Sequence, residues 1–362
     1  MEIRCSGLAR PMICAGSLFF TDLPKDEENN AAKEGTAAGE YLQHLLEGTA
    51  NIPTHAKNGV QFDSDMKFFT KPIADSILGS NHNGDIKCEQ RIDWQTRSGI
   101  VIRGSYDISY SMNGNLHIED LKYGWGIVEV ENNWQLLGYA IGEVIRRGEA
   151  FEKIILRIHQ PRPHHEDGTT RDWTLNYNEL LAIKEKIELR MDQIAAGDKR
   201  LVTSDKCKYC PAAGAACPAF NKAFYRSIEL THDFMQDNIT NEELSFQLDL
   251  ITRMNDVLKV KNDSIKALAV SRIKEGVIIP GYMTENSYGD RKWKSDVNPD
   301  VVKALTGKDI IKKEMLSPAQ AEKIGVPKDF VAQLVDRHFL GQKLVKKDAG
   351  KIADKIFNNK GV

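Results

Sequence analysis

An Asn-Gly pair at positions 113 and 114 constrains the fold more than any other short stretch of the chain. This pair favours the positive φ angles of a two-residue hairpin turn. The flanking stretches, residues 99–111 and 116–124, are rich in apolar and β-branched residues and predict two antiparallel strands. A hairpin centred on the pair places position 107 opposite position 120.

Both of those positions carry carboxylates, Asp107 and Asp120. Two carboxylates brought together across a hairpin repel one another unless a cation lies between them. Carboxylate oxygens suit Mg²⁺ or Mn²⁺. Lys122 lies two residues after Asp120, and therefore on the same face of the strand. An ordinary surface ion pair, which contributes little stability, is the alternative interpretation. The pattern otherwise favours metal-assisted phosphodiester hydrolysis, in which Lys122 orients or activates water or stabilises the transition state.

A helix follows this pattern and carries Gln135 and Tyr139 four residues apart, on one helical face. An amide and a phenol in that position can bind a phosphate backbone near the metal. A plain helix surface is the alternative.

The remaining pattern predicts an α/β core with a mixed central sheet flanked by helices. We expect one domain at residues 1–228 and a mainly helical domain at 229–362 that contacts DNA or a partner. The expected strands are residues 88–94, 126–131 and 153–161, and the expected helices are 36–47, 132–148, 176–197 and 240–276.

Three cysteines, Cys207, Cys210 and Cys217, follow the spacing C-x₂-C-x₆-C. Thiols at this spacing fold readily around one metal centre, and a tetrahedral centre needs a fourth ligand from elsewhere. Structural Zn²⁺ and free thiols stay open as alternatives.

Charge is unevenly distributed along the chain. The net charge is −2, but residues 290–362 contain 16 Lys and Arg against 10 Asp and Glu, a net of +6. A basic segment suits a polyanion such as DNA, although a solvated helical surface also explains it. Within this segment Arg291, Lys292 and Trp293 combine charge with a stacking ring and are candidate DNA contacts. Because no apolar run reaches about 18 residues, we expect no membrane span and an intracellular, cytoplasmic protein.

The linked set of Asp107, Asp120-Leu121-Lys122 and Gln135-x-x-x-Tyr139 resembles the motifs of the PD-(D/E)XK nuclease superfamily, in its RecB-like exonuclease branch with an iron–sulfur cluster. Further stretches resemble an uncharacterised phage-type family of that branch. They are residues 5–17, 120–126, 131–140, 160–162, 280–282 and 291–293.

This resemblance implies a restriction-endonuclease-like core and a Mg²⁺- or Mn²⁺-dependent DNA exonuclease. It implies metal ligation by Asp107, Asp120 and the Leu121 carbonyl, strand positioning by Gln135 and Tyr139, and DNA contact by Arg162. It also implies a role in phage-type recombination or replication, in the host cytoplasm if the chain is phage-encoded, with a single-strand-binding or annealing protein as partner. Oligomeric state is left open.

The resemblance also supplies a fourth cysteine. Nucleases of this branch that carry a cluster use one distant N-terminal cysteine, which corresponds to Cys14, together with three later ones. The set Cys14, Cys207, Cys210 and Cys217 would then hold a [4Fe-4S] cluster as a staple across the nuclease domain.

One position departs from the family pattern. The first helix usually reads G-T-x-x-H, with the histidine a metal ligand, but here Gly39 stands in the histidine position. Glu40 or His44 could substitute as the ligand. The alternative is a catalytically weakened or inactive DNA-binding protein on a nuclease scaffold.

Overall fold

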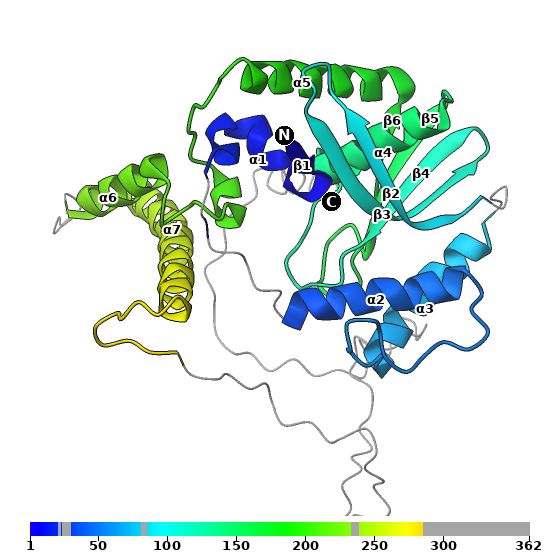
Figure 1. Ribbon diagram of the computed structural model, residues 1–362, viewed down its shortest axis with the longest axis horizontal. Coiled ribbons are helices and arrows are strands. Elements are labelled where there is room, and N and C mark those ends of the chain that lie inside the picture. Colours follow the sequence, from blue (N-terminus) through cyan, green and yellow to red (C-terminus); the bar gives the residue numbers. More distant parts are fainter. Residues whose placement is uncertain (21–22, 24–29, 81–84, 233–238, 285–362) are drawn as a thin grey trace, which may run out of the picture. The chain divides into compact units, whose positions relative to one another are not determined.

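The hairpin predicted from Asn113 and Gly114 is present in the computed structural model, which describes residues 1–20, 23, 30–80, 85–232 and 239–284 (Figure 1). Strands β3 (Val101–Met112) and β4 (Asn115–Leu121) pair antiparallel on either side of the turn. Asn113 and Gly114 have φ angles of 52° and 75°, as this turn requires.

Six strands form one mixed sheet, in which β3 is the central element for the site. β2 (Lys87–Gln95) pairs along one edge of β3. β1 (Glu2–Arg4) pairs with Val101–Arg103, and β4 pairs with Ile108–Met112. Because β2 overlaps both of these stretches, β1 and β4 must share the other edge of β3. Residues 104–107 lie between them, in a gap where that edge has no strand neighbour.

The sheet continues beyond β4 with β5 (Lys153–His159) and β6 (Thr170–Asn176). β4 and β5 run parallel, whereas β5 and β6 run antiparallel. The parallel pair needs a crossover, and α4 (Trp134–Arg147) supplies it. The mixed sheet flanked by helices confirms the predicted α/β class.

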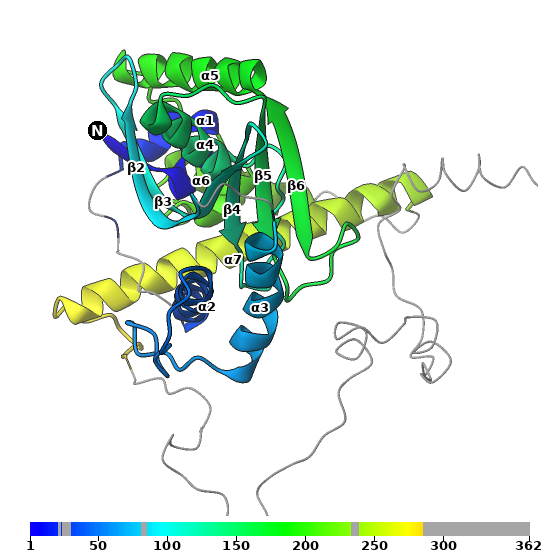
Figure 2. The same ribbon diagram turned by 90° about the vertical axis from the view of Figure 1, so that its right-hand side faces the viewer.

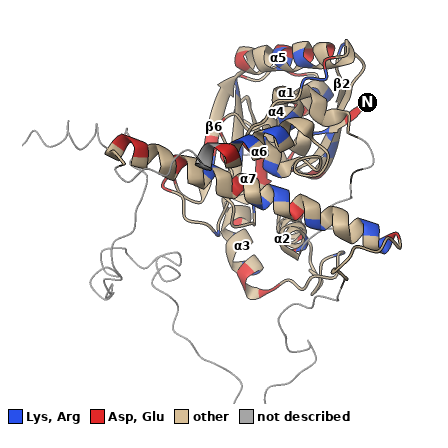
Figure 3. Cartoon of the chain, turned by 90° about the vertical axis from the view of Figure 1, so that its left-hand side faces the viewer, with Lys and Arg blue, Asp and Glu red and all other residues tan. Residues whose placement is uncertain are grey.

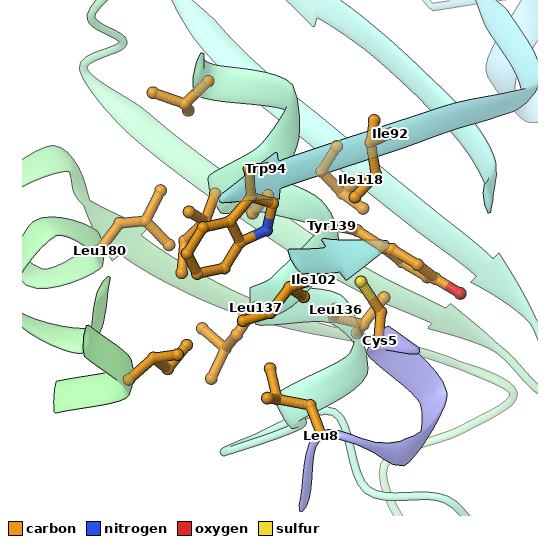
Figure 4. Packing of buried hydrophobic residues seen from close by; sticks show 14 of the residues in the cluster. Cys5, Leu8, Ile92, Trp94, Ile102, Ile118, Leu136, Leu137, Tyr139 and Leu180 are labelled. Carbon is orange, nitrogen blue, oxygen red and sulfur yellow. The ribbon is translucent and has the colours of Figure 1, made fainter. Parts of the chain in front are cut away.

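Helices cover both faces of the sheet (Figure 2). α4 and α5 (Tyr177–Ala195) pack in one apolar cluster with β-strand residues, and α2 (Asn30–Leu46) and α3 (Ser64–Leu78) pack in a second. Two glycines let α4 lie close to η1 (Cys5–Gly7) and to β2. A Cβ at Gly138 would lie 3.0 Å from Cys5 Sγ, and one at Gly142 would lie 2.7 Å from Ile92 Cδ1. Figure 4 shows Tyr139 of α4 beside Cys5 in the first cluster.

Local signals fix the helix ends as the sequence predicted. Asn133 accepts hydrogen bonds from the amides of Gln135 and Leu136 and begins α4, and Gly148 at φ 66° ends it. Gly197, at φ 100°, follows α5. A capping box at Thr240 begins the long helix α7 (Asn241–Lys274). Acidic residues lie in the first turn of α7 and basic residues in its last turn, which suits the helix dipole (Figure 3).

The region after α5 contains the cysteines and continues past residue 228, where we placed the expected division. η3 (Asp205–Tyr209) and α6 (Pro218–His232) contain or flank the cysteines, and α6 runs through position 228. Lys261 of α7 donates hydrogen bonds to the Gly214 carbonyl and, at 2.6 Å, to Asn221 Oδ1. These contacts tie α7 to the cysteine region. The described residues all belong to one compact unit, Met1–Glu285.

Some expected elements are absent and some observed ones were not expected. Residues 126–131, predicted as a strand, form a loop, whereas α3 and β6 were not predicted. The short elements η1 (Cys5–Gly7), α1 (Ala9–Ile13) and η2 (Ala15–Leu18) make up the N-terminal segment after β1. Arg291, Lys292 and Trp293 lie outside the described residues. No helix in the described part of the chain is both long and apolar enough to span a bilayer.

Candidate active site and cysteine centre

The hairpin brings Asp107 and Asp120 together, as its predicted register requires. Ile108 pairs with Glu119, so the two aspartates occupy the next pair of positions toward the gap in the sheet. The Leu121 amide, next to Asp120, donates a hydrogen bond of 2.7 Å to Asp107 Oδ2. Asp120 is 2% exposed. Two carboxylates therefore lie side by side in a largely dry part of the fold.

Lys122 and the α4 side chains complete a connected group around Asp120. Lys122 Nζ lies 2.8 Å from Asp120 Oδ2 and donates to Gln135 Oε1 at 3.1 Å. Gln135 Nε2 in turn donates to Asp120 Oδ1 at 3.3 Å and to the Tyr139 hydroxyl at 2.8 Å. The structure thus places the four residues Asp120, Lys122, Gln135 and Tyr139 in one hydrogen-bonded chain, which links the end of β4 to one face of α4.

Electrostatics explain why a lysine belongs here. Burial raises the pKa of Asp107 well above its usual value, and the neighbouring charges of Asp120 and Glu89 raise it further. Burial acts to lower the pKa of Lys122, but the carboxylates of Asp120 and Asp107 outweigh it, so this pKa is raised. Lys122 is therefore an ammonium ion at neutral pH. In that form it can orient a water or stabilise negative charge, but it cannot remove a proton.

Glu89 on β2 adds a third carboxylate. In the β2–β3 register Cys88 pairs with Ile108 and Gln90 with Tyr106, so Glu89 stands opposite Asp107. Burial raises the pKa of Glu89, and the charge of Asp120 contributes in the same direction. Glu89 therefore lies on the strand beside Asp107.

The strands are irregular at this point. Glu89 has a φ of 49°, a costly conformation for a residue other than glycine. Tyr106 and Ile108 are two residues apart, which on a regular strand puts them on one face. Instead, the Tyr106 hydroxyl reaches Glu143 of α4 at 2.9 Å, and Ile108 packs in the opposite cluster with α2 and α3. The side chains change faces at Asp107, so the carboxylates lie where the sheet bends.

Helix α2 brings Gly39 to the same place. A Cβ built on Gly39 would lie 3.8 Å from Glu89 Oε1, so a longer side chain at this position would reach the carboxylates. The two candidate substitutes are held by other partners. Both oxygens of Glu40 accept from the Lys57 amide, at 3.2 and 3.1 Å, and His44 Nδ1 is bonded to Thr49 Oγ1 at 3.1 Å.

A cavity of 660 Å³ opens beside the carboxylates, with Glu89 and Tyr139 in its wall. Its lining also includes three arginines, Arg4, Arg91 and Arg103. Arg103 pairs with Glu2 at 2.8 Å. Arg4 and Arg91 are exposed and form no ion pair among the described residues. Unpaired guanidinium groups beside a carboxylate cluster make the cavity suitable for phosphate groups.

Arg162, an expected DNA contact, packs against the loop that follows Lys122. Its Cζ atom is 3.8 Å from the ring centroid of Tyr123 and 5.6 Å from that of Trp125. Arg162 Nη1 pairs with Glu34 of α2 at 3.3 Å. Trp125 was not among the predicted site residues.

All four cysteines of the predicted centre line one small cavity of 20 Å³, together with Phe20, Leu201 and Ala213. Burial raises the pKa of Cys207, and Cys210, Cys217 and Cys14 add to the effect. The amides of Val202, Ser204 and Phe220 point at the sulfurs of Cys14, Cys207 and Cys217, at 3.3, 3.4 and 3.5 Å. All six cysteines of the chain are free thiols. Four thiols with amide donors in an apolar pocket fit a Cys₄ metal centre.

Neither the carboxylate group nor the cysteine group has its side chains arranged around a metal position. Within the described ranges, no group of three or more His, Cys, Asp or Glu side chains is arranged to hold a metal ion. At the carboxylates the Lys122 ammonium lies against Asp120. At the cysteines the sulfurs would have to close around the metal.

Comparison with known proteins gives the family but not an activity. The family model of DUF2800, described as a protein of unknown function, matches residues 3–352. The chain belongs to the DUF2800 family. No curated protein matches it. A solved structure titled "Crystal structure of SSO0001" is similar to this DUF2800 protein at 17% identity, over 60% of this chain and 86% of that one. Its TM-score of 0.31 is too low to define a shared fold.

Repulsion among the carboxylates predicts an unusual pH effect for Asp107→Asn. The folded state holds Asp107 protonated to a higher pH than the unfolded state, where an aspartate ionises near pH 4. The wild type therefore loses stability as pH rises above about 4, and the asparagine variant escapes that loss. In metal-free buffer, thermal unfolding should show the stability of Asp107→Asn relative to wild type improving with rising pH.

The matched control is Asp93→Asn, which removes an exposed carboxylate from β2. We expect no such trend for it. A relative stability of Asp107→Asn that is flat or falls with pH would show that Asp107 is not destabilised by its neighbours.

Proposed function

We propose that this DUF2800 protein is a metal-dependent DNA nuclease that acts as an exonuclease on a restriction-endonuclease-like core. The observation that carries the proposal is the contact group of Asp107, Asp120, Lys122 and Gln135 at the bend of a mixed sheet. Repulsion among the crowded carboxylates raises the free energy of the metal-free fold. A divalent cation bound between them would remove that repulsion.

The proposed roles follow from the positions of the side chains. Asp107 and Asp120, with the Leu121 carbonyl, would hold Mg²⁺ or Mn²⁺, which lowers the pKa of a bound water and stabilises charge on the phosphate. Lys122, kept as an ammonium, orients the attacking water and offsets the developing charge. Gln135 fixes the positions of Lys122 and Asp120 by hydrogen bonds to both, and the Tyr139 hydroxyl accepts a hydrogen bond from Gln135. Glu89 offers a carboxylate where the family histidine is missing.

The cavity beside the site supports a nucleic-acid substrate. Arg4 and Arg91 can neutralise backbone phosphates, the contacts that supply most sequence-independent affinity for DNA. A strand bound along this cavity would pass Glu89 and Tyr139 and reach the carboxylates. The proposal places this activity in phage-type recombination or replication in the cytoplasm, with a single-strand-binding or annealing protein as partner.

A second candidate function rests on Gly39. Because Gly39 leaves its position next to Glu89 without a side chain, the site lacks one ligand of the family pattern. The chain would then be a DNA-binding protein on a nuclease scaffold, with Lys122 neutralising the carboxylates permanently.

We also propose that Cys14, Cys207, Cys210 and Cys217 hold a [4Fe-4S] cluster, with Zn²⁺ as the alternative. Either metal would join η2 and its neighbours at the N-terminus to the η3–α6 region. Such a link shortens a very long loop of the unfolded chain and so stabilises the fold.

Substitution of Lys122 tests the nuclease. Protein purified anaerobically, incubated with end-labelled linear duplex DNA and Mn²⁺ or Mg²⁺, should release label. Lys122→Ala should lower the rate by at least about a hundredfold, because the ammonium acts in the transition state. Lys153→Ala, at an exposed position of β5, is the control and should keep the wild-type rate.

Three results separate the candidates. Label lost only with metal and only with Lys122 present supports the nuclease. DNA bound but not cut by the wild type favours the scaffold. Cleavage that survives in Lys122→Ala would mean that the activity comes from elsewhere.

The cysteine centre is tested by its metal content. Anaerobic protein should contain iron and acid-labile sulfide and be brown, whereas the Cys₄ zinc alternative gives colourless protein with zinc. Cys210→Ser should lose the metal and unfold at a lower temperature, while Cys88→Ser, away from the cavity, should keep it. Equal metal content in both variants would remove Cys210 from the centre.

A further inference from the structure

The loop that follows Lys122 exposes an aromatic ring. Trp125 is 70% exposed, three residues beyond the lysine, and no other tryptophan in the described part of the chain is among the exposed large apolar residues. Tyr123, two residues earlier, is buried. A large indole is normally withdrawn from water, so its display beside the candidate catalytic lysine needs a physical reason.

The loop is held in place by buried polar groups. Gln160, 0% exposed, donates through Nε2 to the Gly126 carbonyl at 2.7 Å, and its Oε1 accepts from the Val128 amide at 3.1 Å. Arg171, 5% exposed, donates to Gln160 Oε1 at 2.9 Å and to the Val128 carbonyl at 2.7 Å. Burying an amide and a guanidinium is costly unless they are bonded, and here the loop backbone bonds to the Gln160 amide and to one Nη atom of Arg171. The loop therefore presents Trp125 from a fixed position.

Arg162 packs against the aromatic rings of this loop. Its guanidinium lies over Tyr123 and within 5.6 Å of the Trp125 ring, and Glu34 of α2 anchors it. Arginine near an aromatic face adds a cation–π attraction and limits where the ring can rest. Its positive charge also suits the phosphate of a nucleotide whose base lies on the indole.

We infer that Trp125, backed by Arg162, is a stacking platform for one base of an unpaired DNA strand next to the scissile phosphate. This inference rests on the proposed nuclease function and names its substrate class. Inside a duplex both faces of each base are already stacked on its neighbours, so an unpaired base is the readiest to offer a face to the indole. The site would therefore take single-stranded DNA, or a duplex end whose terminal bases have separated.

A protein partner is the competing occupant, and the same loop contains the residue that separates the two. Ile127 is 53% exposed on this loop. A protein partner that covers the loop as an apolar surface would contact both Trp125 and Ile127. A nucleobase stacked on a ring would use only Trp125.

The experiment measures DNA binding without cleavage. Full-length wild type, Trp125→Ala, Trp125→Phe and Ile127→Ala are titrated, without added divalent metal, against a fluorescein-labelled single-stranded oligonucleotide, and anisotropy gives Kd. We expect Trp125→Ala to weaken binding about five- to a hundredfold, since stacking of one base has this value. Trp125→Phe should restore most of the affinity, and Ile127→Ala should match the wild type.

A second arm asks whether a base is what Trp125 contacts. One base at a time is replaced by an abasic residue along the oligonucleotide. At one position, removing the base should weaken binding to the wild type as much as Trp125→Ala does. The Trp125→Ala variant should then bind this abasic oligonucleotide and the intact one with the same affinity. Unchanged thermal unfolding of the variants shows that the fold is intact.

The failures are distinguishable. If the wild type binds and cuts DNA but Trp125→Ala binds as the wild type does, or no abasic position matters, the platform is wrong and the nuclease stands. Equal losses in Trp125→Ala and Ile127→Ala indicate an apolar protein interface and also overturn the platform. If the wild type neither binds DNA nor cuts it when metal is added, the proposed function fails together with the platform.

Discussion

Repulsion between Asp107 and Asp120 is the constraint to which the rest of the site responds. Burial is the largest cost of charging Asp107, and the hairpin register adds repulsion because it sets the two carboxylates side by side. Lys122, the Leu121 amide and Gln135 partly offset that cost. A fold gains nothing in stability from such an arrangement. We propose that the arrangement serves a function that needs concentrated negative charge, namely holding a divalent cation.

The carboxylates lie next to a stretch of β3 that has no strand neighbour on one edge. β1 and β4 share one edge of β3 and leave residues 104–107 between them without a strand neighbour. The side chains change faces there, Glu89 takes a strained backbone conformation opposite, and Gly39 of α2 comes close. An arginine-lined cavity lies on one side of the carboxylates, and the loop with Trp125 follows Lys122. The elements around the carboxylates thus leave Glu89 in the wall of a cavity that a ligand can enter.

The parts of this site that depend on short-range rules could be predicted from the sequence. Asn113 and Gly114 fix the turn, so the pairing of positions 107 and 120 followed, as did the shared helix face of Gln135 and Tyr139. Contacts between distant segments could not be predicted. Residues 126–131 have strand-like composition, but Gln160 and Arg171 bind the loop backbone around Val128. The approach of Gly39 to Glu89 depends on how α2 packs, and Cys14 joined the cysteine set only through family resemblance. α3 carries an internal proline, Pro72, which weakens its helical signal.

The most direct test of the account is to locate the metal. Crystals of the protein soaked in Mn²⁺ would be measured by anomalous diffraction at the manganese edge. The account predicts a peak within about 2.0–2.5 Å of carboxylate oxygens from both Asp107 and Asp120, with the Lys122 ammonium displaced from Asp120. An empty site, with Lys122 still against Asp120 at saturating Mn²⁺, would contradict the account and leave the ion pair as the permanent state of the protein.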